Sequence, residues 1–131
     1  PLAGALDFLN WMKSVTHPVI VSDTFVEFAN PLMKQLDWPF LLCHSLETDS
    51  SGRITNYKLR QPDPKRKTVQ AFKSLNYNVV SFGDSYNDIS MLEEADKGIL
   101  YRPPENVMKD YPNFPVVNNY QQLKDELLKY I

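Results

Sequence analysis

Apolar residues along this chain follow two patterns, helical spacing in some segments and short continuous blocks in others. Helical spacing predicts helices over residues 2–13, 25–36 and 64–75, a short one around 91–95, and a closing one around 123–128. Continuous apolar blocks predict strands at 19–21, 40–43, 79–82, 98–100 and 115–117. Strands that alternate with helices predict an α/β fold, a doubly wound parallel sheet in three layers with helices on both faces.

One segment interrupts the alternation. Between about residues 45 and 60, two stretches flank Asp49-Ser50-Ser51-Gly52, which has the composition of a turn. We therefore expect a β-hairpin inserted into a single core domain that spans residues 1–131. Pro31, inside the second helix, is expected to kink that helix or to mark a restart.

Composition narrows the class of protein. With 131 residues, the chain has enough length for one core, and 43% hydrophobic and 23% charged residues are ordinary for a globular domain. A formal net charge of −2 argues against a strongly basic nucleic-acid binder. The single cysteine, Cys43, excludes an internal disulfide, and no apolar run has the ~20 residues of a membrane span. We expect a cytoplasmic protein with neither nucleic acid nor membrane as a partner.

The strongest chemical signal follows the strand at 79–82. Asp84 comes at the strand end, and Asp88 lies about one helical turn further on. Two carboxylates at one place repel each other unless a cation or a lysine neutralises them, and oxygen ligands of this kind suit Mg²⁺. The alternative is an ordinary helix start, where acidic groups complement the helix dipole.

Two further signals occur at expected element ends. Ser22-Asp23-Thr24, after the strand at 19–21, offers a hydroxyl and backbone N–H groups to a phosphate, or caps a helix. Lys65, with Arg66 and Lys67, begins the helix at 64–75, where cations either attract an anion or form a solvated charge run. Ligands of such sheets gather at the carboxyl ends of the strands, so together the three signals indicate phosphoryl transfer. His17, His44 and Cys43 lack metal-ligand spacing and are interpreted as structural.

These motifs resemble those of a known enzyme family. Ser22-Asp23-Thr24, Lys65 and the stretch Gly83-Asp84-Ser85-Tyr86-Asn87-Asp88 resemble the second, third and fourth motifs of the haloacid dehalogenase superfamily. Residues 22–36, 61–75, 83–92 and 104–107 resemble its phosphoserine phosphatase/homoserine phosphotransferase branch more closely. The likeness runs along nearly the whole chain.

The resemblance implies roles for the phosphate-binding residues. Ser22, with the backbone of Asp23, would bind the phosphoryl oxygens. Lys65 would neutralise the phosphate and the attacking carboxylate. Lys67 is the competing choice for this lysine, but the local match Asp-Pro-Lys-Arg favours Lys65.

It also implies roles near the metal. Asp84 would ligate Mg²⁺, and Asn87 would contact the substrate or its phosphate. Asp88 would orient the waters of the metal and pair with Lys65.

One part of the family's machinery is missing from this chain. The nucleophile of the family is the first Asp of an Asp-x-Asp motif on a central strand, and no two aspartates here are separated by a single residue. Asp23 follows an apolar strand, but its surroundings match the phosphate-binding motif instead. The resemblance therefore implies that the first strand and a cap lie upstream of Pro1. That strand would lie between those at 18–22 and 78–82.

The function implied is that of a Mg²⁺-dependent phosphoserine phosphatase or phosphoserine:homoserine phosphotransferase, acting through a phospho-aspartyl intermediate. By itself, the chain is expected to be inactive. The alternatives are a non-catalytic α/β binding module of the same fold and a phosphatase for another small phosphate ester. Phosphoserine and homoserine are the expected small-molecule partners, and a homodimer is left open.

Overall fold

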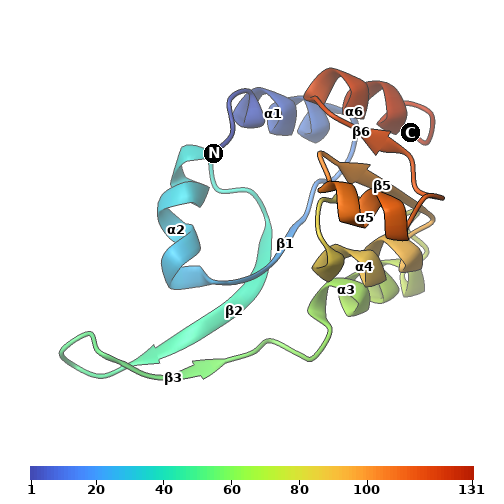
Figure 1. Cartoon of the computed structure of the whole chain (residues 1–131). Helices are drawn as coiled ribbons and strands as arrows, with labels where there is room; N and C mark the ends of the chain where they lie inside the picture. Colours follow the sequence, from blue (N-terminus) through green and yellow to red (C-terminus); the bar gives the residue numbers. More distant parts are fainter. The chain divides into compact units, whose positions relative to one another are not determined.

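The computed structural model describes all residues, 1–131, and the chain forms two compact units, Pro1–Pro64 and Lys65–Ile131. Each unit contains its own three-stranded sheet and its own helices (Figure 1). The predicted α/β class is therefore confirmed, whereas the single domain over residues 1–131 stays a prediction.

The first unit has the order α1 (Ala5–Val15), β1 (Ile20–Phe25), α2 (Val26–Gln35), β2 (Leu41–Thr48) and β3 (Ile54–Lys58). Strand β1 pairs with β2 in parallel, and β2 pairs with β3 antiparallel. Pro31 lies within α2 without ending it, so the alternative of a restart was wrong. Helix α2 buries Ala29 and Met33, while Phe28 is 62% exposed.

The inserted hairpin is confirmed, with one change in its boundaries. The predicted strand at 40–43 and the first arm of the hairpin form one continuous strand, β2 (Figure 1). The turn is closed by the Asp49 carboxylate, which accepts hydrogen bonds from the backbone N–H groups of Ser51 (2.9 Å) and Arg53 (3.0 Å). Gly52 has a φ of 84°, a left-handed conformation that glycine adopts without steric cost.

Strand β1 is longer than the sequence predicts, and it is irregular. Ile20 and Val21 face Leu41 and Leu42 in regular register, and pairing resumes only where Phe25 faces His44. Three residues, 22–24, therefore stand opposite the single residue Cys43 in a bulge. Such bulges re-aim side chains and backbone groups, and they are frequent beside functional sites.

The second unit contains a parallel sheet of order β4-β5-β6 and most of the helices. Its elements are α3 (Pro64–Ser74), β4 (Val80–Gly83), the 3₁₀ turn η1 (Tyr86–Asp88), α4 (Ile89–Glu94), β5 (Lys97–Tyr101), α5 (Glu105–Asp110), β6 (Val116–Val117) and α6 (Tyr120–Leu127). Helix α5 was not predicted. It has six residues and buries Val107 alone, so it gives no apolar periodicity.

The core of this unit lies around β5. Leu100 belongs to a buried cluster with side chains from α3, α4 and α5, namely Val69, Ile89, Met91, Leu92 and Val107. Ile99, which points to the opposite face because strand side chains alternate, is also fully buried. Both faces of β5 are thus covered, as a parallel sheet requires. Past the last turns of α3 and α6, Leu75 and Leu128 are 66% and 55% exposed.

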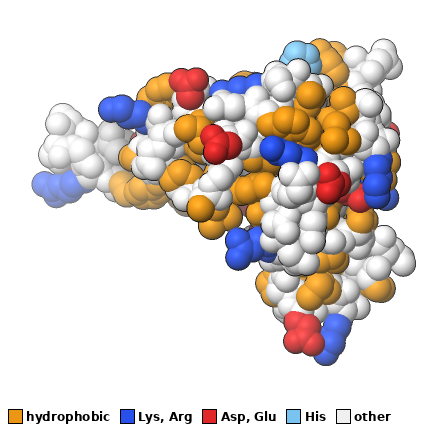
Figure 2. Space-filling model, turned by 90° about the horizontal axis from the view of Figure 1, so that it is seen from above, with side chains coloured by type: hydrophobic (Ala, Val, Ile, Leu, Met, Phe, Trp, Pro, Cys, Tyr) orange, Lys and Arg blue, Asp and Glu red, His pale blue; other side chains and the backbone are white.

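Strands β1 and β4 each pair with a neighbouring strand on one side only. The sequence analysis expects a further strand beside each of them. Strand β1 is one of the two outer strands of the first sheet, and β4 is one of the two outer strands of the second; β3 and β6 are the others. On the face shown in Figure 2, acidic and basic side chains are scattered among apolar and neutral ones, with no single-sign field. No helix has the length and apolar character to cross a bilayer.

Candidate active site

The second unit holds a buried ion pair at the end of β4. Lys65 Nζ, from the first turn of α3, lies 2.8 Å from Asp88 Oδ1. The other oxygen, Asp88 Oδ2, accepts hydrogen bonds from the backbone N–H groups of Asp84 (2.9 Å) and Ser85 (3.2 Å) and from the Ser85 hydroxyl (3.3 Å). The two charged side chains are only 13% and 10% exposed. Both carboxylate oxygens of Asp88 are therefore engaged.

The local sequence explains this arrangement. Ser85 precedes the 3₁₀ turn and forms a capping box with Asp88, so the acidic side chain folds back over the strand end. Gly83 allows the carboxylate to approach, because a Cβ atom at residue 83 would collide with the Asp88 side chain. The short polar sequence after β4 thus holds Asp88 in one orientation.

The electrostatics of Asp88 follow from its partners. Burial by itself would raise the pKa of Asp88, because it disfavours the charged form. The hydrogen bond and charge of Lys65, together with the backbone N–H groups of Ser85 and Asp84, outweigh burial and lower the pKa of Asp88. Asp88 is consequently held as a carboxylate.

Asp84 and Asn87 lie beside this pair with their side chains free. Both residues are exposed, and neither side chain makes a hydrogen bond or an ion pair. Lys67, the competing lysine, is exposed in the same way, whereas Lys65 makes the predicted pair with Asp88. The catalytic roles of these residues stay predictions.

The donor set at the end of β4 fits a Mg²⁺ ion in part. Mg²⁺ binds through one or two carboxylates and keeps several waters, and the unengaged Asp84 carboxylate meets the first requirement. The Asp88 carboxylate already accepts hydrogen bonds from Lys65 and from backbone N–H groups. It therefore suits the role of a hydrogen-bond acceptor for waters around the ion better than that of a direct ligand. The chain contains no cluster of three or more potential metal-ligating side chains.

The predicted phosphate-binding residues Ser22 and Asp23 belong to the first unit, in the bulge of β1. Ser22 Oγ accepts a hydrogen bond of 3.2 Å from the backbone N–H of Thr24, which gives the bulge a tight local turn. The Asp23 side chain is 46% exposed. The structure thus describes two groups of candidate residues, one in each unit: Lys65, Asp84, Asn87 and Asp88 in the second, and Ser22 and Asp23 in the first.

His44 is a neighbour of Asp23 that the sequence analysis treated as structural. It is 6% exposed, its Nδ1 accepts a hydrogen bond of 3.0 Å from the backbone N–H of Arg60, and its Nε2 lies 3.9 Å from Asp23 Oδ1. Because Nδ1 is an acceptor, the neutral ring carries its proton on Nε2, toward Asp23. Nothing in the sequence indicates this contact, since it depends on the register of β1 against β2.

The family model of the haloacid dehalogenase-like hydrolases matches residues 1–96. The chain belongs to this family. It is 56% identical over 129 residues to "Phosphoserine phosphatase ThrH" of Pseudomonas aeruginosa, and 53% identical over 129 residues to a "Phosphoserine phosphatase" of Pseudomonas syringae pv. tomato. Both alignments cover 98% of this chain but only 63% and 54% of the relatives, so the chain spans little more than half of their length.

Solved structures show the same fold. A phosphoserine phosphatase in apo form aligns with a TM-score of 0.76 at 22% identity, over all of this chain and 67% of that one. A phospho-aspartyl intermediate analogue of phosphoserine phosphatase aligns with a TM-score of 0.74 at 22% identity, over all of this chain and 64% of that one. At this identity the likeness concerns the fold alone.

Proposed function

We propose that the protein containing this chain is a Mg²⁺-dependent phosphoserine phosphatase that can also transfer the phosphoryl group to homoserine. The observation that carries the proposal is the buried Lys65–Asp88 pair beside the unengaged Asp84 carboxylate. Two relatives above 50% identity, both named phosphoserine phosphatases, support the substrate class. The cytoplasmic location stays a prediction.

In this proposal, four residues of the chain bind the substrate and its phosphate. The Ser22 hydroxyl and the backbone N–H of Asp23 donate hydrogen bonds to phosphoryl oxygens, and the bulge of β1 presents both. The Lys65 ammonium supplies positive charge, which stabilises the negative charge that spreads over the phosphoryl oxygens during transfer. Asn87, exposed and unpaired, donates an amide hydrogen bond to the substrate.

The carboxylates of Asp84 and Asp88 have the remaining roles, metal binding and positioning. Asp84 would hold the magnesium ion, which when bound would supply positive charge against the phosphate and orient the ester. Asp88 accepts hydrogen bonds from waters around the ion and holds the Lys65 ammonium in place. Its lowered pKa keeps it ionised in these tasks.

The covalent step requires a residue outside this chain. A carboxylate oxygen of an upstream Asp forms a bond to phosphorus, the bond to the serine oxygen breaks, and the second Asp of the same motif gives that oxygen its proton. Water then attacks the phospho-aspartate and releases inorganic phosphate, while the second Asp accepts the proton. When the hydroxyl of homoserine attacks instead, the product is phosphohomoserine.

The test uses the protein expressed from its complete coding sequence. We expect phosphate release from phosphoserine that requires Mg²⁺ and stops with EDTA, and label transfer to homoserine when homoserine is added. The 131-residue chain alone should release none. No turnover by the complete protein would favour a non-catalytic binding module, and faster turnover of another small phosphate ester would favour a different phosphatase.

A further inference from the structure

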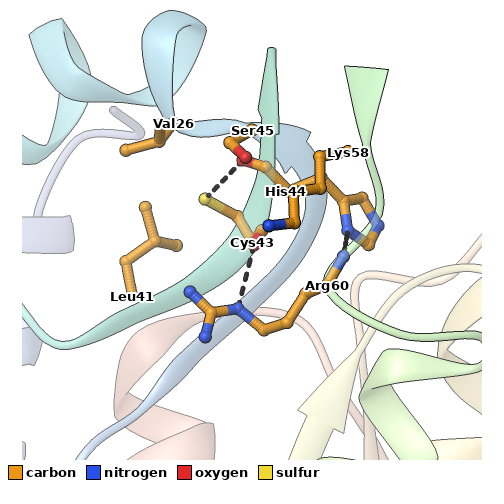
Figure 3. Close-up of a pocket in the computed structure, with 7 residues that line it drawn as sticks. All are labelled: Val26, Leu41, Cys43, His44, Ser45, Lys58 and Arg60. Atoms are coloured by element: carbon orange, nitrogen blue, oxygen red, sulfur yellow. Dashed lines mark hydrogen bonds between the residues drawn. The ribbon is translucent and has the colours of Figure 1, made fainter. Parts of the chain in front are cut away.

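The first unit contains a pocket of about 350 Å³ that the proposed function does not use. It lies beside β2, between the start of α2 and the segment that follows β3 (Figure 3). Its lining residues are Val26, Leu41, Cys43, His44, Ser45, Lys58 and Arg60. None of them belongs to the residues proposed for phosphoryl transfer.

The Arg60 side chain is held in place while most of its donors stay free. Its Nε donates a hydrogen bond of 3.1 Å to the backbone carbonyl of Cys43, and its backbone N–H donates to His44 Nδ1. The two terminal nitrogens of the guanidinium extend past Cys43 toward Leu41 (Figure 3). These nitrogens have no partner, so a fixed fork of N–H donors is left for a ligand.

The two charged residues that line the pocket, Lys58 and Arg60, are both basic. The ammonium of Lys58 has no ion-pair partner, and no carboxylate is among the lining residues. Two carboxylates outside the lining lie next to lining residues, and both are engaged: Glu27, whose charge acts on Cys43, accepts the backbone N–H of Leu46 through Oε2 at 3.0 Å, and Asp23 Oδ1 lies 3.9 Å from Nε2 of His44. Burial raises the pKa of the Cys43 thiol, although the Arg60 charge opposes the rise, so the thiol adds no negative charge.

The opposite wall of the pocket is apolar. Leu41 and Cys43, two residues apart on β2, share a face of the strand, and Val26 from α2 completes the wall (Figure 3). A free phosphate ion would satisfy the cations but would leave this wall in contact with water. A short alkyl chain ending in a carboxylate would pair its carboxylate with the basic side chains and cover the apolar wall with its methylene groups.

We infer that this pocket binds a short aliphatic carboxylate, with the carboxylate on the free nitrogens of Arg60 and near Lys58, and the methylene groups against Val26 and Leu41. The planar guanidinium matches a carboxylate in two parallel hydrogen bonds. The inference depends only on the first unit and is independent of the proposed phosphatase activity.

The test is an NMR titration of the ¹⁵N-labelled protein with acetate, propionate and butyrate at constant ionic strength. We expect saturable shifts of the backbone resonances of Cys43, Ser45 and Arg60, and affinity that rises about fourfold for each added methylene group. Arg60→Gln should weaken butyrate binding about tenfold or more. Lys58→Gln should also weaken butyrate binding. Because the Lys58 side chain makes no hydrogen bond or ion pair, this variant still tests the inference if the arginine variant does not fold.

Matched controls decide the result. Arg53→Gln removes an exposed arginine of the hairpin turn that does not line the pocket, and it should leave butyrate binding unchanged. Inorganic phosphate should not reverse the resonance shifts that butyrate causes. The inference is wrong if acetate and butyrate bind equally, if phosphate competes as well as butyrate, or if Arg60→Gln and Lys58→Gln both bind like the unmodified protein.

Discussion

Lys65 Nζ lies 2.8 Å from Asp88 Oδ1, and this pair joins the first turn of α3 to the 3₁₀ turn η1 that follows β4 within one unit. The two residues are 23 positions apart in the sequence, so the contact is tertiary. Because both side chains are almost fully covered, each charge depends on the other for compensation. Removal of either partner should therefore destabilise the unit, and the pair determines the electrostatics of the candidate site.

Lys65→Met should destabilise the protein and raise the pKa of Asp88. The substitution leaves a covered carboxylate without its cation, which costs about 3 kcal/mol of unfolding free energy. Urea unfolding measures the loss, and carboxyl-carbon NMR measures the pKa. Lys67→Met removes an exposed, unpaired lysine of the same helix and should change stability by no more than about 0.5 kcal/mol. Equal effects of the two substitutions would contradict the assignment.

The stability contributed by Asp88 should depend on pH in a defined direction. Its pKa is lowered in the folded state, so near pH 4 the unfolded chain binds more protons than the folded one. The contribution is fully present above the unfolded pKa of about 3.9 and disappears as the pH falls through the lower folded pKa. Asp88→Asn should therefore flatten the stability profile in this acidic range.

The control for this pH effect is Asp125→Asn. Asp125 is exposed in α6, where it accepts a hydrogen bond from Gln121 and has no cationic partner, so Asp125→Asn should leave the stability profile close to that of the unmodified protein. Unfolding free energies measured between pH 2 and about pH 6 compare the variants. A profile of Asp88→Asn as steep as that of the unmodified protein would show that the folded state does not stabilise the Asp88 carboxylate.

Sequence reasoning predicted well what depends on local pattern. Apolar blocks indicated the buried strands, and the turn residues around Gly52 indicated the hairpin. Helix α5 escaped detection because six residues with one buried side chain give no period. Leu75 and Leu128 continue the apolar spacing of α3 and α6 and are nevertheless exposed, because periodicity does not show where a helix stops contacting its neighbours.

The candidate site was predictable to a similar extent. The Lys65–Asp88 contact was expected from the family resemblance, and the capping sequence around Ser85 explains its geometry. The contact of His44 with Asp23 could not be predicted, because it depends on a bulge that shifts the register of β1 by two residues against β2. Single-residue polar contacts of this kind depend on strand register, which the sequence specifies only weakly.

Gly83→Ala should disturb Asp88 directly. A methyl group at residue 83 would overlap the Asp88 carboxylate, which four hydrogen bonds hold in place, so either the strand end or the carboxylate must move. We expect a loss of about 1–3 kcal/mol in thermal unfolding and lower phosphatase activity of the complete protein.

Gly52→Ala is the matched substitution for Gly83→Ala. Nothing lies within 4 Å of the position of its added methyl group, and its cost of about 1 kcal/mol would come from the left-handed backbone alone. It should lower stability without lowering activity at a temperature where the protein is folded. Loss of activity in both variants to the same extent would rule out a specific effect through Asp88.

Asp84→Asn should separate metal binding from folding. The Asp84 carboxylate makes no hydrogen bond or ion pair, so its neutralisation should change the unfolding free energy by no more than about 0.5 kcal/mol. Mg²⁺ affinity of the complete protein, measured by calorimetry, should fall about tenfold or more. Asp37→Asn, at an exposed residue of the first unit, should leave it unchanged. Unaltered Mg²⁺ binding by Asp84→Asn would exclude Asp84 as a ligand.

The unpaired outer strands β1 and β4 predict that a segment outside this chain stabilises it. Each presents backbone groups without a strand partner on one side, and the apolar side chains of Val19, Val21, Val79 and Phe82 are only half-buried. Full burial of these four side chains would add several kcal/mol to the free energy of unfolding, which is comparable to the net stability of a domain.

The comparison that tests this expectation is urea unfolding of the 131-residue chain beside the protein expressed from its complete coding sequence. We expect a lower unfolding midpoint for the shorter chain, and faster backbone hydrogen exchange in β1 and β4 than in β5, which is paired on both sides. Strand β3 serves as an internal control, because it is an outer strand whose exchange should not change between the two proteins. An isolated chain as stable as the complete protein, with β1 and β4 equally protected in both, would mean that no further strand pairs with them.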